Sequence, residues 1–273
     1  MNILKEKTAI ITGASMGIGF EIAKGYINAG ASIIICSRNK EELYGAEDNL
    51  RKILSNNQKI LAIPADISLQ EDIDNLFYNI HRNNFDVNIL VNNAGIMGIE
   101  STIDDANWQD WINVININLL GSVLMCKKIL PIFKNNKYGK ILQLSGGGAT
   151  LPTPNFSSYA VSKAGIVRFI ETLAKEVGQY NIDVNAIAPG KLKTRMNKEV
   201  NNNDSVDFSN VVNLSIFLAS DKSNGITGKL ISAQWDNWED FPNHLEELKN
   251  SDVYTLRRIV GKERNMLWGD RIT

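Results

Sequence analysis

Short apolar runs rich in β-branched residues alternate along the chain with longer segments of helical periodicity. Several runs are apolar at successive positions, as strands buried on both faces of a sheet are. Between 17 and 29, Ile18, Ile22, Tyr26 and Ala29 recur every three or four positions and form one helical stripe. This alternation predicts an α/β fold, a single doubly wound parallel sheet of about seven strands with helices on both faces. The expected strands are Thr8–Thr12, Ser32–Cys36, Ile60–Ile63, Asn88–Val91, Lys140–Leu144, Ile182–Ile187 and Lys229–Ser232, and the expected helices include Gly17–Ala29, Asn107–Phe133 and Ser157–Gln179.

Length and charge limit the possible functions. The 273 residues suit one large α/β domain, and 44% hydrophobic with 22% charged residues exclude a mainly disordered chain. The formal net charge is −1, so the basic excess typical of nucleic-acid binders is absent. The histidines, His81 and His244, have no partner at metal-ligand spacing, so we expect no metal site.

The chain offers no sequence sign of secretion or of a membrane. The start, MNILKEKTAIITG, lacks the apolar core and cleavage site of a signal peptide, and no stretch approaches the roughly 20 apolar residues of a membrane span. Cys36 and Cys126 lie in apolar runs and are expected to be buried free thiols, as a reducing compartment would keep them. We therefore expect a cytoplasmic protein that does not bind membranes.

A glycine-rich turn follows the first strand, in the order Thr12-Gly13-Ala14-Ser15-Met16-Gly17-Ile18-Gly19. One glycine allows a sharp turn, another lets backbone N–H groups approach a pyrophosphate, and a third lets the helix pack on the sheet. The helix N-terminus then favours the anion. A tight turn without a ligand is the alternative, but the strand before and the helix after are the context that a Rossmann-type dinucleotide site requires.

This segment resembles the TGxxxGxG signature of the short-chain dehydrogenase/reductase family. Two further segments resemble motifs of the same family, in the same order along the chain. They are NNAG, which supports the central sheet and flanks the cofactor, and PGxxxT, whose backbone and threonine contact the nicotinamide carboxamide. The resemblance extends from about Lys5 to Gly228. It implies cofactor contacts at Gly13, Ser15, Met16, Gly17, Ile18, Gly19, Asn93, Ala94, Gly95, Pro189, Gly190 and Thr194.

The end of the second expected strand indicates which dinucleotide binds. An acidic residue there would bind the ribose hydroxyls of NAD and repel a 2′-phosphate, but this chain has Ser37 followed by Arg38. An arginine pairs with a phosphate and stacks on adenine, so NADP(H) is favoured over NAD(H). Asp66, with Ile67 after it, resembles the family's aspartate that reads the adenine amino group. A helix cap is the alternative role for Asp66.

Tyr159 and Lys163 have the YxxxK spacing inside an expected helix, so the phenol and the ammonium lie on one face. A free tyrosine has a pKa near 10, and a neighbouring cation would lower it toward neutral pH. Tyr159 would then exchange a proton with a carbonyl or alcohol while a nicotinamide exchanges hydride. The resemblance adds that Lys163 binds the nicotinamide ribose and that Asn118 orders a water in a proton relay.

One position departs from the family, which usually has a serine thirteen residues before the tyrosine. Here that position is Gly146, and Ser145 precedes it. Three interpretations are open. The glycine-rich loop could shift so that Ser145 contacts the substrate, another group such as Thr150 could polarise the carbonyl, or the chemistry could be weak or altered. The N–H groups of Gly146–Gly148 could also bind an anionic substrate group.

The end of the chain also departs from the family, since the final strand lacks the usual DGG and about 35 residues follow Trp238. This extension either lines the substrate pocket or packs at a subunit contact. Its aromatic and basic residues are Trp235, Trp238, Phe241 and Trp268 with Arg257, Arg258 and Arg264. The combination of SGGGAT with ISAxWDxW resembles a less studied subgroup that we associate with sugar and nucleotide-sugar substrates.

These features predict an NADP(H)-dependent oxidoreductase that interconverts an alcohol and a carbonyl, with a sugar or nucleotide-sugar as substrate. Residues 1–238 would form the dinucleotide-binding and catalytic domain, with 239–273 packed on it. Tyr159, Lys163 and Asn118 would be catalytic, with Ser145 as a substrate contact. The family usually forms homodimers or homotetramers through its long helices. A 3-oxoacyl carrier-type reductase and a catalytically impaired NADP(H)-binding regulator are the alternatives.

Overall fold

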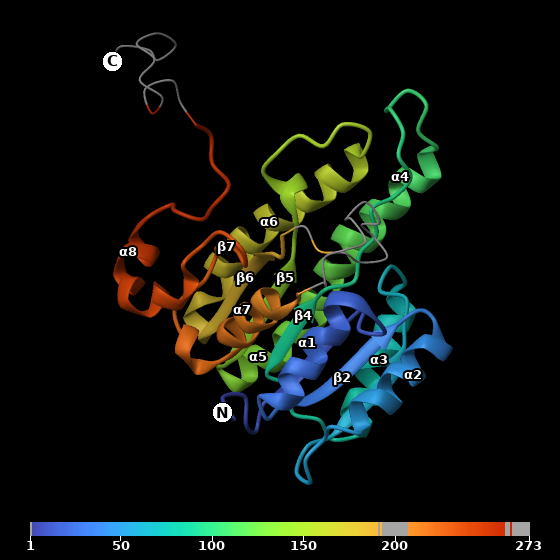
Figure 1. The fold of residues 1–273 in the computed structure, drawn as a ribbon, viewed down its shortest axis with the longest axis vertical. Helices are drawn as coiled ribbons and strands as arrows, with labels where there is room; N and C mark the ends of the chain where they lie inside the picture. Colours follow the sequence, from blue (N-terminus) through green and yellow to red (C-terminus); the bar gives the residue numbers. More distant parts are fainter. Residues whose placement is uncertain (1, 191, 193–206, 260–262, 264–273) are drawn as a thin grey trace.

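Seven parallel strands form one sheet, in the order β3-β2-β1-β4-β5-β6-β7 (Figure 1). The computed structural model describes residues 2–190, 192, 207–259 and 263. The strands are β1 (Thr8–Thr12), β2 (Ser32–Ser37), β3 (Ile60–Pro64), β4 (Ile89–Asn92), β5 (Gly139–Leu144), β6 (Ile182–Ala188) and β7 (Leu230–Ser232). They confirm the predicted sheet, and each boundary lies within one residue of its predicted position.

Two layers of helices cover the sheet (Figure 1). One layer holds α1 (Gly17–Asn28), α2 (Lys40–Arg51) and α7 (Ser209–Ala219), and the other holds α3 (Gln70–Arg82), α5 (Ser122–Asn136) and α6 (Ser157–Val177). Successive strand residues point to opposite layers, since Ala9 and Ile11 belong to one apolar cluster and Ile10 to the other. The strand order reverses between β1 and β4, and ligands of such sheets bind where the carboxyl ends of these strands diverge.

The expected helix Asn107–Phe133 is divided in the structure. It consists of α4 (Trp108–Ile115), a π-helical turn (Asn116–Gly121) and α5. At the end of the turn the backbone lies against the loop after β3, where a Cβ on Gly121 would stand 2.7 Å from the Ile67 carbonyl oxygen.

By length and composition, the whole segment Trp108–Asn136 is long and apolar enough to cross a membrane. This property was not predicted from the sequence, because asparagines and lysines interrupt the apolar residues of the segment. In the fold Met125, Cys126 and Ile129 are fully buried in the core. The apolar side of this segment therefore packs on the sheet.

The C-terminal segment lies beside β7, the last strand of the sheet (Figure 1). It consists of a 3₁₀ segment (Trp238–His244), α8 (Leu245–Asn250) and an irregular segment, residues 251–259, which we call the strap. Lys229 Nζ donates to the carbonyls of Ser251 and Val253 at 3.1 and 3.0 Å, and the Tyr254 carbonyl accepts the Leu230 N–H at 2.7 Å. The bond to Tyr254 occupies one backbone N–H of β7 that an edge strand would otherwise expose, and the side chain of Lys229 holds the strap in place.

Two aromatic residues of the extension pack against the core of the domain. Phe241 is buried in the main core, and the Trp238 ring stands 5.5 Å from Phe217 of α7, so both stabilise the domain itself. Trp235 is 83% exposed. Trp268 and Arg264 lie outside the described residues.

Candidate active site

The loop after β1 is bound tightly to the loop after β4. The Thr12 hydroxyl accepts the N–H groups of Asn93 and Ala94, both at 3.0 Å. In return, Asn93 Nδ2 donates to the carbonyls of Thr12 and Gly13 at 2.9 and 3.0 Å. Gly13 has φ +64°, and a Cβ there would stand 2.8 Å from Ala94 Cα. Thr12 is fully buried, and the sequence analysis assigned it no role although it begins the motif.

The N-terminus of α1 is suited to a phosphate group. Met16 precedes the helix in an extended conformation, and no side chain caps the first N–H groups, whereas Asn39 caps α2 and Asn107 caps α4. Gly17 has φ +60°, and a Cβ on Gly19 would stand 2.6 Å from the Gly13 carbonyl oxygen. Ser15 and Ile18 are part-exposed beside this opening. These residues therefore fit the pyrophosphate of a dinucleotide.

The end of β2 carries the residues expected to select the dinucleotide. Arg38 is 57% exposed, and its guanidinium lies 3.8 Å from a carboxylate oxygen of Asp66 in the loop after β3. The other oxygen of Asp66 accepts the backbone N–H and the hydroxyl of Ser68, at 2.9 and 2.7 Å. Asp66 thus caps its own turn as well as facing Arg38. Ser37 is part-exposed and donates to the Asn39 carbonyl, while Ile67 is buried.

Tyr159 and Lys163 lie one turn apart near the N-terminus of α6, as predicted. Lys163 Nζ stands 5.6 Å from the centre of the Tyr159 ring and donates to the Leu144 carbonyl at 2.9 Å. Burial lowers the pKa of Lys163 to about 8. Burial also raises the pKa of Tyr159, which is the opposite of the direction expected from a neighbouring ammonium. For both groups, the loss of hydration on burial is what shifts the pKa, and it disfavours the charged form of each.

The loop after β5 gives Ser145 and Gly146 different environments. The Ser145 hydroxyl is enclosed and has no hydrogen-bond partner, so a contact with substrate would require the loop to move. Gly146 faces the phenol directly, since a Cβ on it would stand only 2.5 Å from Tyr159 Oη. The Tyr159 hydroxyl therefore occupies the space in which the family's serine side chain would begin. Thr150 is exposed and donates to the Gly147 carbonyl at 3.4 Å.

Asn118 is fully buried in the π-helical turn and fastens the loop after β4. Its Oδ1 accepts the Ile96 N–H and its Nδ2 donates to the Ile96 carbonyl, both at 2.8 Å. Nδ2 also donates to the Ser162 hydroxyl at 3.0 Å. Gly95 lies between Asn118 and Lys163, because a Cβ on it would stand 3.1 Å from Asn118 Oδ1 and 3.7 Å from Lys163 Nζ.

The segment after β6 approaches the same edge of the sheet. Gly190 follows Pro189 with φ +85°, and a Cβ there would stand 2.3 Å from Gln234 Oε1, so only glycine fits this turn. The sequence analysis did not anticipate Gln234 at this position. Thr194, the expected nicotinamide contact, lies outside the described residues.

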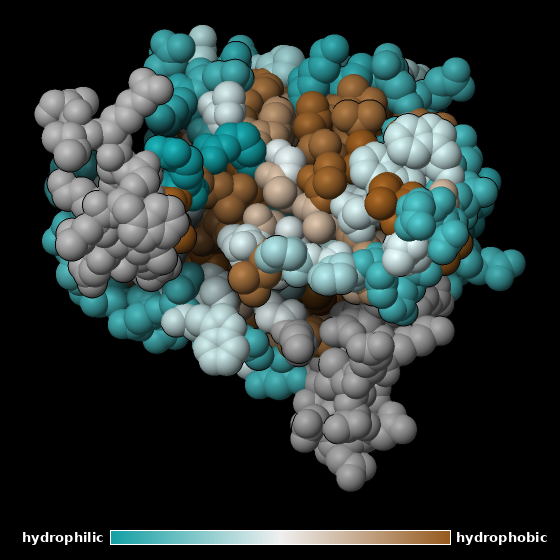
Figure 2. Space-filling model, turned by 90° about the horizontal axis from the view of Figure 1, so that it is seen from above, coloured by the Kyte–Doolittle hydropathy of each residue, from teal (hydrophilic) through white to brown (hydrophobic). Residues whose placement is uncertain are grey.

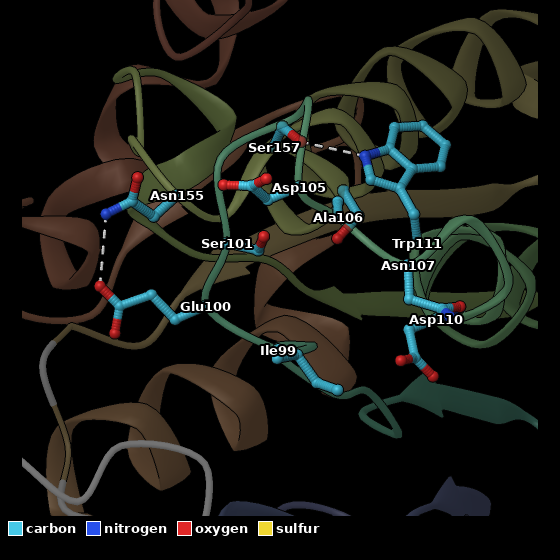
Figure 3. Close-up of a pocket in the computed structure, with 11 residues that line it drawn as sticks. Ile99, Glu100, Ser101, Asp105, Ala106, Asn107, Asp110, Trp111, Asn155 and Ser157 are labelled. Carbon is cyan, nitrogen blue, oxygen red and sulfur yellow. Dashed lines mark hydrogen bonds between the residues drawn. The ribbon is translucent and has the colours of Figure 1, made fainter.

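A pocket of about 210 Å³ opens beside the N-terminus of α6, between the loop after β4 and the loop after β5 (Figure 3). The carboxylates of Glu100, Asp105 and Asp110 line it, with no basic residue among its lining residues. Two hydrogen bonds join its walls. Trp111 Nε1 donates to the Ser157 hydroxyl at 3.0 Å, and Asn155 Nδ2 donates to Glu100 at 3.3 Å.

Seen from above, apolar side chains gather in the middle of the molecule's face, between hydrophilic margins (Figure 2).

The buried charge of Lys163 should affect stability. Because burial lowers its pKa from 10.5 to about 8, the unfolded chain binds more protons between these values, and stability should rise with pH across that window. We expect Lys163→Met to remove this dependence and to raise the free energy of unfolding at pH 7 by on the order of 1–3 kcal/mol. Urea unfolding at several pH values measures this, with Lys175→Met on the exposed face of α6 as control. An unchanged pH slope would contradict the assignment.

The chain belongs to the short-chain dehydrogenase family, whose model matches residues 7–205. It is 37% identical over 197 residues to 3beta-hydroxysteroid dehydrogenase 1 of Eggerthella lenta, covering 72% of this chain and 74% of the relative. It is 32% identical over 242 residues to the 3-oxoacyl-[acyl-carrier-protein] reductase of Chlamydia trachomatis, covering 84% and 96%. Glucose 1-dehydrogenase 2 of Bacillus subtilis is 34% identical over 203 residues, covering 74% and 78%. The chain is therefore an oxidoreductase of a class that acts on alcohol and carbonyl groups.

Solved structures share the fold. A putative gluconate dehydrogenase from Agrobacterium tumefaciens superposes with a TM-score of 0.79 at 27% identity, covering 84% of this chain and 94% of that structure. A gluconate 5-dehydrogenase from Burkholderia cenocepacia, solved with NADP and tartrate, superposes with a TM-score of 0.77 at 24% identity, covering 84% and 94%. These structures establish the fold, whereas a nicotinamide dinucleotide as cofactor follows from membership of the short-chain dehydrogenase family.

Proposed function

We propose that the protein is an NADP(H)-dependent oxidoreductase that interconverts an alcohol and a carbonyl, with Tyr159 as acid and base. The observation that carries this proposal is the placement of Tyr159 and Lys163 beside the loops after β4 and β5, where Gly95 approaches Lys163 and Gly146 approaches Tyr159. Tyr159 Oη gives a proton to the carbonyl oxygen, or takes one from the alcohol. The nicotinamide, when bound, supplies or accepts the hydride.

Other residues of the site hold the reacting groups. The glycine loop and the α1 N-terminus bind the pyrophosphate, and Asn93, Ala94 and Gly95 shape the adjoining wall. Lys163 would orient the nicotinamide ribose, and Pro189 and Gly190 would contact the nicotinamide carboxamide, for which the family motif also assigns Thr194. Asn118 orders the relay that returns protons from solvent. Ser145 acts on the substrate only after a loop shift, because its hydroxyl is enclosed.

NADP(H) rather than NAD(H) is proposed from the end of β2. Ser37 replaces the acidic residue that would repel a 2′-phosphate, and the exposed guanidinium of Arg38 is available to pair with one. The carboxylate of Asp66, 3.8 Å away, orients Arg38 and would accept a hydrogen bond from the adenine amino group.

Arg38→Ala is expected to weaken NADPH binding about 10- to 100-fold, because a charge-assisted pair with phosphate contributes roughly 1.5–3 kcal/mol. NADH binding should change less than about threefold, since it lacks the 2′-phosphate. Nucleotide fluorescence titration of both cofactors measures this, with Arg82→Ala at the exposed end of α3 as control. Equal affinities of the unsubstituted protein for the two nucleotides would overturn the NADP assignment.

The substrate proposal is an uncharged, hydroxyl-rich carbonyl compound such as a sugar. The pocket at the N-terminus of α6, which Ser157 and Ser158 line, offers carboxylates, an amide and an indole that suit hydroxyl groups. Its three carboxylates would disfavour a substrate that enters it with an anionic group. This charge argues against a nucleotide-sugar and against a 3-oxoacyl carrier-type reductase. A screen of sugars and acyl-carrier substrates, followed by NADPH oxidation, separates these candidates.

A catalytically impaired NADP(H)-binding regulator is the second candidate. Gly146 lacks the hydroxyl of the usual serine, the Ser145 hydroxyl is enclosed, and burial raises the pKa of Tyr159. Such a protein would bind NADPH tightly and show no turnover with any carbonyl.

We also propose a cytoplasmic homo-oligomer. The face formed by α5 and α6 carries an apolar groove between Val123, Leu130, Phe169 and Leu173, and the nearby Leu120 and Val161 are 52% and 49% exposed. Since the Tyr254 carbonyl already accepts the Leu230 N–H at the edge of β7, a homodimer through these helices is favoured over assembly through that edge. The buried, unpaired Cys36 and Cys126 suit a reducing compartment.

A further inference from the structure

Three enclosed side-chain atoms in the described part of the chain have no hydrogen-bond partner, and their residues lie on or just after two neighbouring strands. They are Asn92 Oδ1, Gln143 Oε1 and Ser145 Oγ. Gln143 and Ser145 are two residues apart on and just after β5, so they point to the same face of the sheet. Asn92 is the residue of β4 that pairs with Gln143 in the parallel register. Buried polar atoms nearly always have partners, so three adjacent exceptions indicate a ligand.

A rotation of the Asn92 or Gln143 amide group that exchanges its oxygen and nitrogen would not give these oxygens hydrogen-bond partners. Asn92 Nδ2 donates to the Ser122 carbonyl at 3.3 Å and to Cys126 Sγ at 3.4 Å, both on α5. Gln143 Nε2 donates to the Leu144 carbonyl at 3.2 Å. Rotation of either amide would place its oxygen against a carbonyl oxygen. Both amide oxygens therefore remain acceptors that require a donor.

We propose that Asn92, Gln143 and Ser145 enclose an internal water site that positions Lys163 through the Leu144 carbonyl. One water molecule supplies two O–H donors for the two amide oxygens and accepts the Ser145 O–H, which matches the three atoms without remainder. Gln143, held in this way, keeps its Nε2 on the Leu144 carbonyl, which is also the acceptor of Lys163 Nζ at 2.9 Å. Gln143 is thus a positioning residue, and its effect on turnover rests on the role proposed above for Lys163.

The water site is tested without any activity measurement. A high-resolution crystal structure of the full chain should show a water within about 3 Å of all three oxygen atoms, and the Gln143→Met variant should lose it. Protein donors bonded to these oxygens, or no solvent density between them, would overturn the proposal. This outcome does not depend on whether the protein turns over a carbonyl substrate.

The positioning role has a separate test. Gln143→Met keeps the side-chain length and removes the amide, and small displacements of a catalytic group are costly, so we expect kcat to fall about tenfold. The pH dependence of kcat should also move, while KM for the carbonyl substrate stays within about twofold. The ionisable groups around the site are Lys163 and Tyr159 of α6 and Cys126 of α5. Gln179→Met, at an exposed position after α6, serves as control.

Asn92→Leu separates the water from a merely structural contact. The Asn92 side chain has no recorded hydrogen bond to Leu144 or Lys163, but it supplies one of the two amide oxygens. If one water joins the three residues, Asn92→Leu should shift the pH dependence in the same direction as Gln143→Met. A pH profile that neither variant moves, in a protein that folds and binds NADPH, would overturn the positioning role.

Discussion

Tyr159→Phe is expected to lower kcat by about 10²–10⁴-fold, because the phenol is proposed to exchange the proton and a buried phenylalanine cannot. NADPH binding should remain within about twofold, since the ring stays in place and only one oxygen is lost. The measurement is steady-state oxidation of NADPH by a carbonyl substrate, combined with fluorescence titration of the cofactor. This variant tests the centre of the proposed mechanism.

The matched control is Tyr78→Phe, which removes a phenol that is 63% exposed on α3, far from the carboxyl ends of β4 and β5. Its activity should equal that of the unsubstituted protein. If Tyr159→Phe keeps a substantial part of the activity, the proton comes from another group. If the unsubstituted protein binds NADPH but reduces no carbonyl in the screen, the regulator becomes the better interpretation.

The fold was predictable because burial on both faces of the sheet leaves a plain record in the sequence. Runs such as SIIIC allow few structures other than a central strand, and the observed β2 extends the predicted one only to Ser37. The π-helical turn at Asn116–Gly121 was not predictable from periodicity, because a turn of π-helix shifts the apolar stripe by only one residue. Its place follows from the tertiary approach of Gly121 to the Ile67 carbonyl.

The arrangement of the candidate site was predictable where it depends on spacing along the chain. The glycines around Ser15 and the pair Tyr159 and Lys163 are of this kind. The glycines belong to one loop, and the pair is separated by one helical turn, so the local backbone sets their relative positions. Enclosure is different, because it depends on packing among distant elements. Three features therefore appear only in the fold. They are the buried hydroxyl of Ser145, the raised pKa of Tyr159 and the hydrogen bonds between Thr12 and Asn93.

Gly146→Ser provides the sharpest test of the loop after β5, because two interpretations predict opposite results. If the missing serine weakens an otherwise ordinary enzyme, restoring the hydroxyl should raise the rate by up to about 10²–10³-fold. The structure predicts a loss instead, because a Cβ at Gly146 would stand 2.5 Å from Tyr159 Oη. The phenol is held by a largely buried ring, so relief of this overlap must move the group that is proposed to transfer the proton.

We therefore expect Gly146→Ser to lower kcat at least about tenfold, with NADPH binding nearly unchanged. Gly147→Ser is the matched control, since it adds the same side chain to the same loop and a Cβ there would meet nothing within 4 Å. It should keep most of the activity. A gain of activity in Gly146→Ser would show that the loop yields readily, and the serine of other family members would then be the missing substrate contact. A loss confined to Gly146→Ser would mean that this chain has placed its catalytic phenol where that serine usually stands.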